Sequence, residues 1–181
     1  ALEPWAAYWE LRVRLGEASP QEIQSFMQRY AGTYQEDRLR NDWLLLLGQR
    51  RDWSQFAEQH PSYRMSDDRE VRCYALLIDQ IKGTAPATVA EDVRSNWYAI
   101  RDADDGCTHA ARELYGYKKL SALDVWRKAR LGVEANRPRV VRTAVEIVSP
   151  ESLPQLKDVL DAPSKYLLSR ATAAGKARQE L

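Results

Sequence analysis

The chain has 181 residues, and its 44% hydrophobic content is enough for one domain with a real core. Charged residues make up 29% and the formal net charge is +1, which excludes a disordered chain and a strongly basic nucleic-acid-binding protein. No apolar run is long enough to span a membrane; the leucine run, Leu44 to Leu47, is only four residues long before Gly48. Because the chain begins with Ala1 and carries no basic-then-apolar leader, we expect a processed or shortened piece of a protein.

The first half of the chain shows apolar residues at helical spacing, separated by Pro and Gly signals. Four helices are expected: from about Glu3 to Gly16, from Pro20 to Tyr30, a third that ends at Gly48, and a short one around Trp53 and Phe56 that stops before Pro61. Ser19 and Glu22 have the spacing of a capping box at the start of the second helix.

The second half repeats this design. Helices are expected from Asp67 to Gly83, Thr88 to Ile100, Cys107 to Tyr117, Ser121 to Asn136, Pro138 to Val148, Glu151 to Leu160 and Ser164 to Ala173. Thr88 and Glu91 suggest another capping box. The stretch from Val140 to Val148 has enough valine for a strand, but its apolar spacing favours a helix.

Short helices joined by short loops favour stacked helical hairpins over a compact bundle of long helices. The sequence lacks a strict period such as the 34-residue tetratricopeptide repeat. We therefore predict an all-α fold, an irregular α-solenoid of short antiparallel helical hairpins that forms one domain, or a fragment of one, over residues 1–181.

Candidate catalytic groups are few. The carboxylate pairs Asp67-Asp68, Glu91-Asp92 and Asp104-Asp105 stand at expected helix starts or in a loop, where acidic residues cap helices. The two histidines, His60 and His109, have no partner at metal-ligand spacing, and the glycines are scattered singly. We expect no catalytic residue, no metal site and no cofactor in this chain.

Six tryptophans and nine tyrosines raise the possibility of sugar binding, because aromatic faces stack on pyranose rings. Five of the tryptophans nevertheless lie at helical spacing with aliphatic residues, which favours core packing: Trp5, Trp9, Trp43, Trp97 and Trp126. Tyr115 and Tyr117, on either side of Gly116, are better candidates for exposed aromatic residues.

The stretch from Lys118 to Arg142 has eight basic residues and two acidic ones, so it is much more basic than the chain as a whole. The simpler interpretation is the solvated faces of two helices, and the functional one is a surface for a polyanion such as murein or a nucleic acid. The sequence has no RNA-binding motif, so nucleic acid is the weaker alternative and is not expected as a partner. The candidate contact residues are Lys118, Lys119, Arg127, Lys128 and Arg130, together with Tyr115 and Tyr117.

The two cysteines are Cys73 and Cys107. In a cytosolic protein two such residues are most often unrelated buried thiols, whereas in an exported protein they would pair. Cys73 lies inside one expected helix and Cys107 begins another after one intervening helix, an order that brings the two close. A bridge closing a loop of this length stabilises a fold by about 4 kcal/mol on the chain-entropy model.

Several runs resemble the superhelical, U-shaped domain of the soluble lytic murein transglycosylases. They are LRNDWLLLLGQRRDWSQFAEQHP (Leu39 to Pro61), VRCYALLIDQIKG (Val71 to Gly83), DDGCTHA around Cys107, and SALDVWRKARLGVEANRPRVVRTAV (Ser121 to Val145). The resemblance covers about Trp5 to Val145, and its specificity comes from the order and spacing of the motifs. The second cysteine falls at about the family's separation from the first.

This resemblance implies a right-handed α-superhelix in which a disulfide between Cys73 and Cys107 ties neighbouring helices together. It also implies a periplasmic protein whose linker domain and lysozyme-like catalytic domain are absent from this chain. The whole enzyme would cleave the MurNAc–GlcNAc β-1,4 bond of peptidoglycan glycan strands to 1,6-anhydro products, and this chain alone would be inactive. Because the family's superhelical region is longer, we expect a truncated region or a shorter relative. The alternative is a free-standing α-solenoid adaptor that binds a protein or peptide in its groove.

Overall fold

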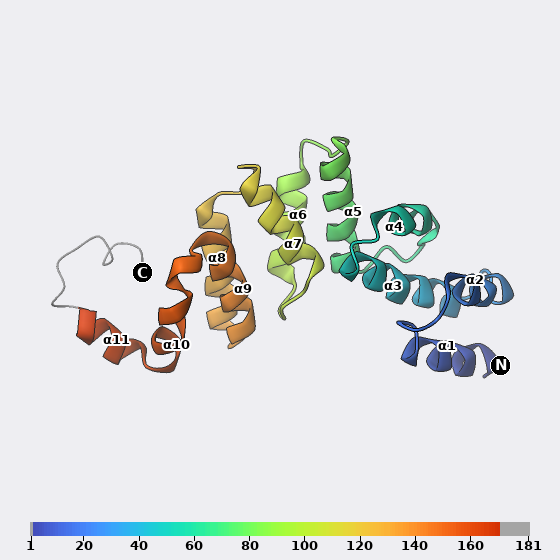
Figure 1. Cartoon of the computed structure of the whole chain (residues 1–181), viewed down its shortest axis with the longest axis horizontal. Helices are drawn as coiled ribbons and strands as arrows, with labels where there is room; N and C mark the ends of the chain where they lie inside the picture. The colour runs from blue at the N-terminus through green and yellow to red at the C-terminus, as the bar shows by residue number, and fades with distance from the viewer. Residues whose placement is uncertain (1, 171–181) are drawn as a thin grey trace. The chain divides into compact units, whose positions relative to one another are not determined.

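The computed structural model describes residues 2–170, and within these residues all regular structure is helical (Figure 1). Eleven α-helices are present: α1 (Glu3–Val13), α2 (Pro20–Arg29), α3 (Tyr34–Gln49), α4 (Trp53–Gln59), α5 (Arg69–Lys82), α6 (Val89–Ala99), α7 (Gly106–Gly116), α8 (Ala122–Glu134), α9 (Pro138–Val148), α10 (Leu153–Asp161) and α11 (Pro163–Arg170). Short 3-10 turns cover His60–Ser62 and Pro150–Ser152. The all-α prediction is confirmed, including the helix over the valine-rich stretch.

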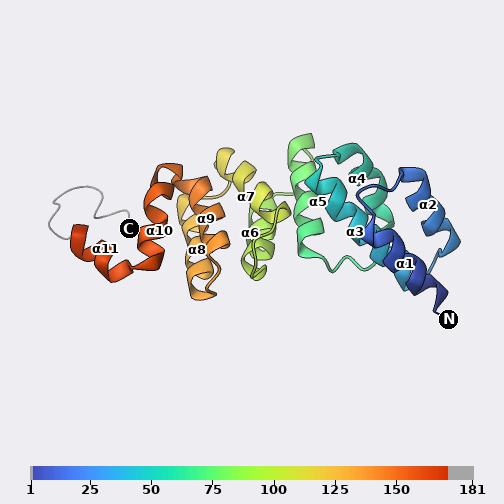
Figure 2. The same cartoon turned by 60° about the horizontal axis from the view of Figure 1, so that its bottom comes forward.

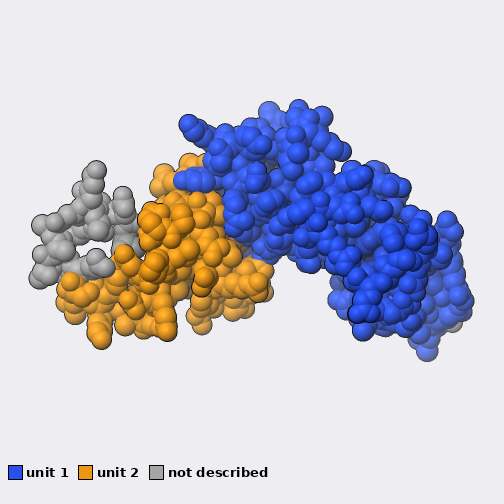
Figure 3. Space-filling view, viewed as in Figure 1, with its two compact units in different colours: residues 1–100, 104–119 blue, residues 101–103, 120–181 orange. Residues whose placement is uncertain are grey.

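The described chain divides into two compact units (Figure 3). Unit 1 holds residues 1–100 and 104–119, and unit 2 holds residues 101–103 and 120–181. The expectation of one domain over residues 1–181 stays a prediction. Residues 171–173, expected at the end of the last helix, lie outside the described residues. None of the helices in residues 2–170 has the length and apolarity that a bilayer crossing demands.

Helix starts follow the capping residues that the sequence offers. The Ser19 side chain accepts a hydrogen bond from the backbone N–H of Glu22 at 3.2 Å, and Ser121 forms a complete capping box with Asp124. The capping box expected at Thr88 is wrong: its hydroxyl accepts no backbone hydrogen bond at the helix start and donates to the carboxylate of Asp92 at 2.8 Å. Thr88 has a ψ of 0° and not the extended backbone that a capping residue usually adopts.

Unit 1 is organised around α3, against which α1, α2, α4 and α5 pack. Helices α5, α6 and α7 lie side by side and contact one another pairwise (Figures 1 and 2). The largest side chains of the core around α3 are almost fully buried: Tyr8, Ile23, Leu39, Trp43, Leu44, Phe56, Val71 and Tyr74. Burial of this apolar surface is the main source of stability for unit 1.

Tyr74 lies where α5 comes closest to its neighbours. Its side chain is fully buried, and a Cβ atom built on Gly48 of α3 would stand 2.4 Å from its ring. A Cβ atom built on Gly106, the first residue of α7, would stand 2.7 Å from the Glu70 side chain and 3.0 Å from the Tyr74 ring. Both glycines are therefore required by close packing and not by an unusual backbone conformation.

Polar contacts fix the same junction. The Tyr74 hydroxyl donates to Asp105 at 2.5 Å, and the Arg51 guanidinium donates to the same carboxylate at 2.9 Å. Burial acts to raise the pKa of Asp105, but these two hydrogen bonds outweigh it and lower that pKa. One oxygen of Glu70 accepts the backbone N–H groups of Asp105 and Gly106 at 3.0 Å each, so α5 supplies a cap for the start of α7.

Cys73 and Cys107 form a disulfide in this structure, with their Cα atoms 4.9 Å apart and both residues fully buried. The bond joins the first half of α5 to the start of α7, as the order of helices and the family resemblance both suggested. The expected pairing is confirmed.

Unit 2 begins with α8 and α9, which run side by side (Figure 2). A Cβ atom on Gly132 would come within 2.9 Å of Val141, so the two backbones approach as closely as Gly132 allows. Helix α10 packs on α9, and α11 packs on α10. Arg137 forms an ion pair with Asp102, which ties residues 101–103 to this unit.

Replacing Cys73 or Cys107 by serine should lower the free energy of unfolding by about 4 kcal/mol under oxidising conditions, because the loop they close becomes free in the unfolded chain. Thermal unfolding followed by circular dichroism measures the change. With reductant present, the variant and the wild type should melt within a few degrees of each other. An equal loss under both conditions would show that the cysteines act through packing alone.

Gly48→Ala should destabilise unit 1 by about 3 kcal/mol, since the added methyl group overlaps the buried Tyr74 ring, which has no room to move. The matched control is Gly116→Ala at the end of α7, where an added Cβ atom meets nothing within 4 Å. That variant should unfold at the same denaturant concentration as wild type, or slightly higher, because alanine favours helix over glycine by up to about 1 kcal/mol. Equal midpoints for both variants would contradict the close-packing argument.

Candidate functional site

The residues expected to contact a polyanion fall in both units. Tyr117, Lys118 and Lys119 are exposed in unit 1, and Tyr115 is half-buried. Lys119 donates a hydrogen bond to the side chain of Gln80 at 2.7 Å. These four residues therefore stay candidates for ligand contact.

In unit 2, Arg127 and Arg130 are exposed on α8, whereas Lys128 is buried with 3% of its surface accessible. The expectation that Lys128 contacts a ligand at the surface is wrong, because so little of this residue is accessible. Arg142 forms an ion pair with Glu146 one turn further along α9. The basic stretch is thus partly neutralised by its own acidic neighbours.

The carboxylate pairs have structural partners. Asp68 caps α5 by accepting the backbone N–H groups of Glu70 and Val71, and Asp104 accepts the N–H of Cys107 at 2.5 Å. Asp105 is held by Arg51 and Tyr74. The hydrogen bonds from Arg51 and Tyr74 lower the pKa of Asp105, so this carboxyl group is a poor proton donor at neutral pH.

Both histidines stack on aromatic rings. His60 lies against Phe56 with ring centroids 5.4 Å apart, and His109 lies against Trp53 at 6.4 Å. Burial lowers the pKa of each histidine, and the positive charge of Arg51 lowers that of His109 further. Among residues 2–170, no three His, Cys, Asp or Glu side chains gather closely enough to hold a metal ion.

The tryptophans divide into buried and exposed groups. Trp43 and Trp97 are in the core, as expected, and Trp126 is half-buried. The core assignment of Trp5 and Trp9 is wrong, since 36% and 51% of their surfaces are accessible. Helix α1 has two apolar faces: Tyr8 and Leu11 point into the core, while Trp5 and Trp9, one turn apart, face outward.

Trp5, Trp9 and Tyr34 form an exposed aromatic shelf on α1 and the start of α3. The indole rings of Trp5 and Trp9 have centroids 6.4 Å apart and planes inclined by only 23°. The Tyr34 ring lies 5.8 Å from that of Trp5, and 53% of the Tyr34 surface is accessible. The buried Tyr8 ring packs against the Trp5 ring in a T-shaped arrangement, with centroids 5.9 Å apart.

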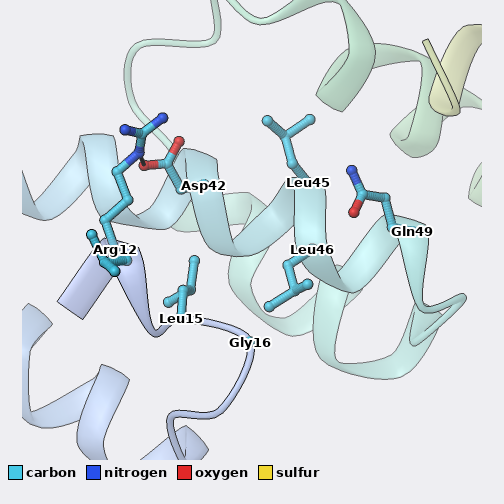
Figure 4. Close-up of a pocket in the computed structure, with 8 residues that line it drawn as sticks. Arg12, Leu15, Gly16, Asp42, Leu45, Leu46 and Gln49 are labelled. Carbon is cyan, nitrogen blue, oxygen red and sulfur yellow. Dashed lines mark hydrogen bonds and ion pairs between the residues drawn. The ribbon is translucent and has the colours of Figure 1, made fainter. Parts of the chain in front are cut away.

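A cleft of about 350 Å³ opens between the end of α1 and α3 (Figure 4). It is lined by Arg12, Val13, Leu15, Gly16, Asp42, Leu45, Leu46 and Gln49. The Arg12 guanidinium lies 5.3 Å from the ring centre of Trp9, so Arg12 connects the aromatic shelf to the cleft.

Asp42 organises the polar side of this α1–α3 cleft. One of its oxygens accepts hydrogen bonds from the Tyr8 hydroxyl at 2.7 Å and from Arg12 Nε at 3.1 Å. Burial and the neighbouring Asp42 raise the pKa of Tyr8, so the phenol stays protonated as a donor. The cleft thus combines leucine side chains with fixed hydrogen-bonding groups, an arrangement suited to binding an amphipathic ligand.

Comparison of the chain with models of known protein families finds no match. Comparison with curated proteins finds no match either.

Replacing Trp5 and Trp9 together by phenylalanine should remove most of the tryptophan emission that acrylamide quenches, because these two indoles are exposed. The free energy of unfolding should change by less than about 0.5 kcal/mol, as is usual for surface substitutions. Trp97→Phe is the control: its fully buried indole contributes little quenchable emission, so the accessible fraction should not fall. An accessible fraction that is unchanged in the double variant would contradict the exposure of the shelf.

Proposed function

We propose that this chain is the superhelical scaffold region of a peptidoglycan lytic transglycosylase. In this proposal the helices form a right-handed α-superhelix of short antiparallel hairpins, and the chain positions glycan strands or the catalytic domain. The all-helical structure of residues 2–170 is consistent with such a fold. The right-handed path of the superhelix is part of the proposal.

The observation that carries the proposal is the disulfide between Cys73 and Cys107. The family resemblance requires a bond between these two positions, and a Cα separation of 4.9 Å is a geometry that a disulfide accepts. Disulfides persist in oxidising compartments, so the bond also supports a periplasmic protein. Two unrelated buried cysteines would have no reason to meet across α5 and α7.

In this proposal, catalysis and glycan positioning belong to different domains of a longer protein. A linker domain and a lysozyme-like catalytic domain would supply the acid that protonates the glycosidic oxygen. The carboxylates at the helix starts of this chain serve as caps and ion-pair partners, as at Asp68 and Asp105. We therefore assign to this chain a role in binding and positioning.

The test compares the isolated chain with the protein as it occurs in the source cells. Antibodies raised against the chain would precipitate the native protein, and both samples would be incubated with murein sacculi. Chromatography of the soluble products should show 1,6-anhydromuropeptides from the precipitated native protein and none from the isolated chain.

Two controls make this comparison decisive. A precipitate obtained with pre-immune serum should release no product, which excludes a contaminating enzyme. Non-reducing and reducing electrophoresis of the native protein reports whether its cysteines are paired. A native protein no longer than this chain, with no product, would support the adaptor alternative and reject the scaffold proposal.

A further inference from the structure

We propose that the stack of His109 on Trp53 is an acid-sensitive contact, which fastens α4 to α7 while the imidazole is neutral and releases α4 when the imidazole is protonated. The contact lies within unit 1 and joins residues that are far apart in the sequence. This inference goes beyond the proposed function and does not rest on it.

The two rings lie nearly parallel at the edge of a buried aromatic group. Trp53 begins α4 and His109 lies in the first turn of α7, with their ring centroids 6.4 Å apart and their planes inclined by only 17°. The Trp53 ring also packs against the Tyr74 ring of α5 at 6.1 Å. His109 therefore connects α4 to the junction at which α3, α5 and α7 meet.

One ring nitrogen of His109 makes the neutral form the favourable one. Its Nδ1 atom is buried and has no hydrogen-bond partner within residues 2–170, although the residue as a whole is only half-buried. In the neutral ring this nitrogen presents a lone pair and the proton resides on Nε2. Protonation of Nδ1 would place an unpaired N–H group and a positive charge in the buried position, and both are costly there.

The charges around His109 add to this preference. Arg51, which precedes α4, has its guanidinium carbon 5.8 Å from the centre of the Trp53 ring on which His109 stacks. Burial lowers the pKa of His109 most, the charge of Arg51 lowers it further, and the opposing carboxylates do not outweigh the two. The titratable and charged groups at this contact are Arg51 before α4, Glu70 and Tyr74 on α5, Asp105 before α7, and Arg112 and Glu113 on α7.

Acid should therefore weaken the contact. A histidine whose pKa is lower in the folded chain stabilises the fold above its ordinary value of 6.5, and this stability is lost as the pH falls through the lowered pKa. Helix α4 has seven residues and depends on tertiary contacts for its stability, so we place the loss there. Helices α5 and α7 stay joined by the disulfide.

Nuclear magnetic resonance of the full chain, prepared without a histidine tag, reads the ring directly. The sequence holds two histidines, so His60→Gln and His109→Gln assign both ring systems. We expect the neutral His109 ring to carry its proton on Nε2 and to titrate with a midpoint below 6.5. Arg51→Gln should raise that midpoint, because it removes a positive charge. His60→Gln should leave it unchanged, since His60 stacks on Phe56 at the other end of α4.

Amide hydrogen exchange tests the release of α4. About one pH unit below the measured midpoint, α4 of the wild type should exchange about threefold or more faster than α4 of His109→Gln at the same pH. About one unit above it the order should reverse, because the variant then lacks only the stack. The amides of α5, which is joined to α7 by the disulfide, should exchange equally in both proteins at either pH.

His109→Phe is the second variant and keeps the measurement decisive if His109→Gln does not fold. Its uncharged ring can stack on Trp53 at any pH, so α4 should stay protected on both sides of the wild-type midpoint. A His109 midpoint at or above 6.5, a neutral ring protonated on Nδ1, or wild-type α4 exchange that changes with pH as in His109→Phe would each overturn the inference. None of these results bears on the product test of the native protein.

Discussion

The close approach of α5 to α3 and α7 at Tyr74 is the constraint on which the rest of unit 1 depends. The Tyr74 ring fills space that a side chain at Gly48 or Gly106 would occupy. Only at this distance can the α5 carboxylate of Glu70 cap the start of α7 and the sulfur of Cys73 reach Cys107. The packing, the cap and the covalent bond therefore reinforce one arrangement, in which each contact lowers the entropic cost of the next.

Helix α3 connects this junction to the candidate binding site. Gly48 near its end receives Tyr74, while Tyr34 at its start belongs to the aromatic shelf. Between them, Asp42 holds both Tyr8 and Arg12 of α1. Because α1 is fixed to α3 through its Tyr8 face, its other apolar face is left outward, and Trp9 is presented on a rigid element. Sites built on helices held in this way are better preorganised than sites on loops.

The carboxylates at the helix starts form hydrogen bonds and ion pairs with other groups of the protein itself. Asp68, Asp104 and Asp105 are occupied by backbone N–H groups or by cations at helix starts. The pKa of Asp105 is lowered by its partners, the opposite of the raised pKa that a general acid requires at neutral pH. This use of carboxylates is consistent with our proposal that another domain of a longer protein supplies the catalytic acid.

The sequence by itself determined the local structure, because helical periodicity, prolines and caps act over a few residues. The helix that begins at Pro20 and the one over Val140 to Val148 needed no tertiary information. The tertiary structure decided which apolar face of α1 is buried, so Trp5 and Trp9 were misassigned to the core and the site was missed. The sequence did show that α1 has apolar residues on two faces, and only one of these faces can pack against α3. Helical periodicity gives the spacing of apolar residues, but it does not say which face meets a packing partner. The burial of Lys128, which was expected at the surface, was likewise decided by the tertiary structure. The pairing of Cys73 with Cys107, in contrast, was expected from the order of the helices and from the family resemblance, and the packing of α5 against α7 realises it.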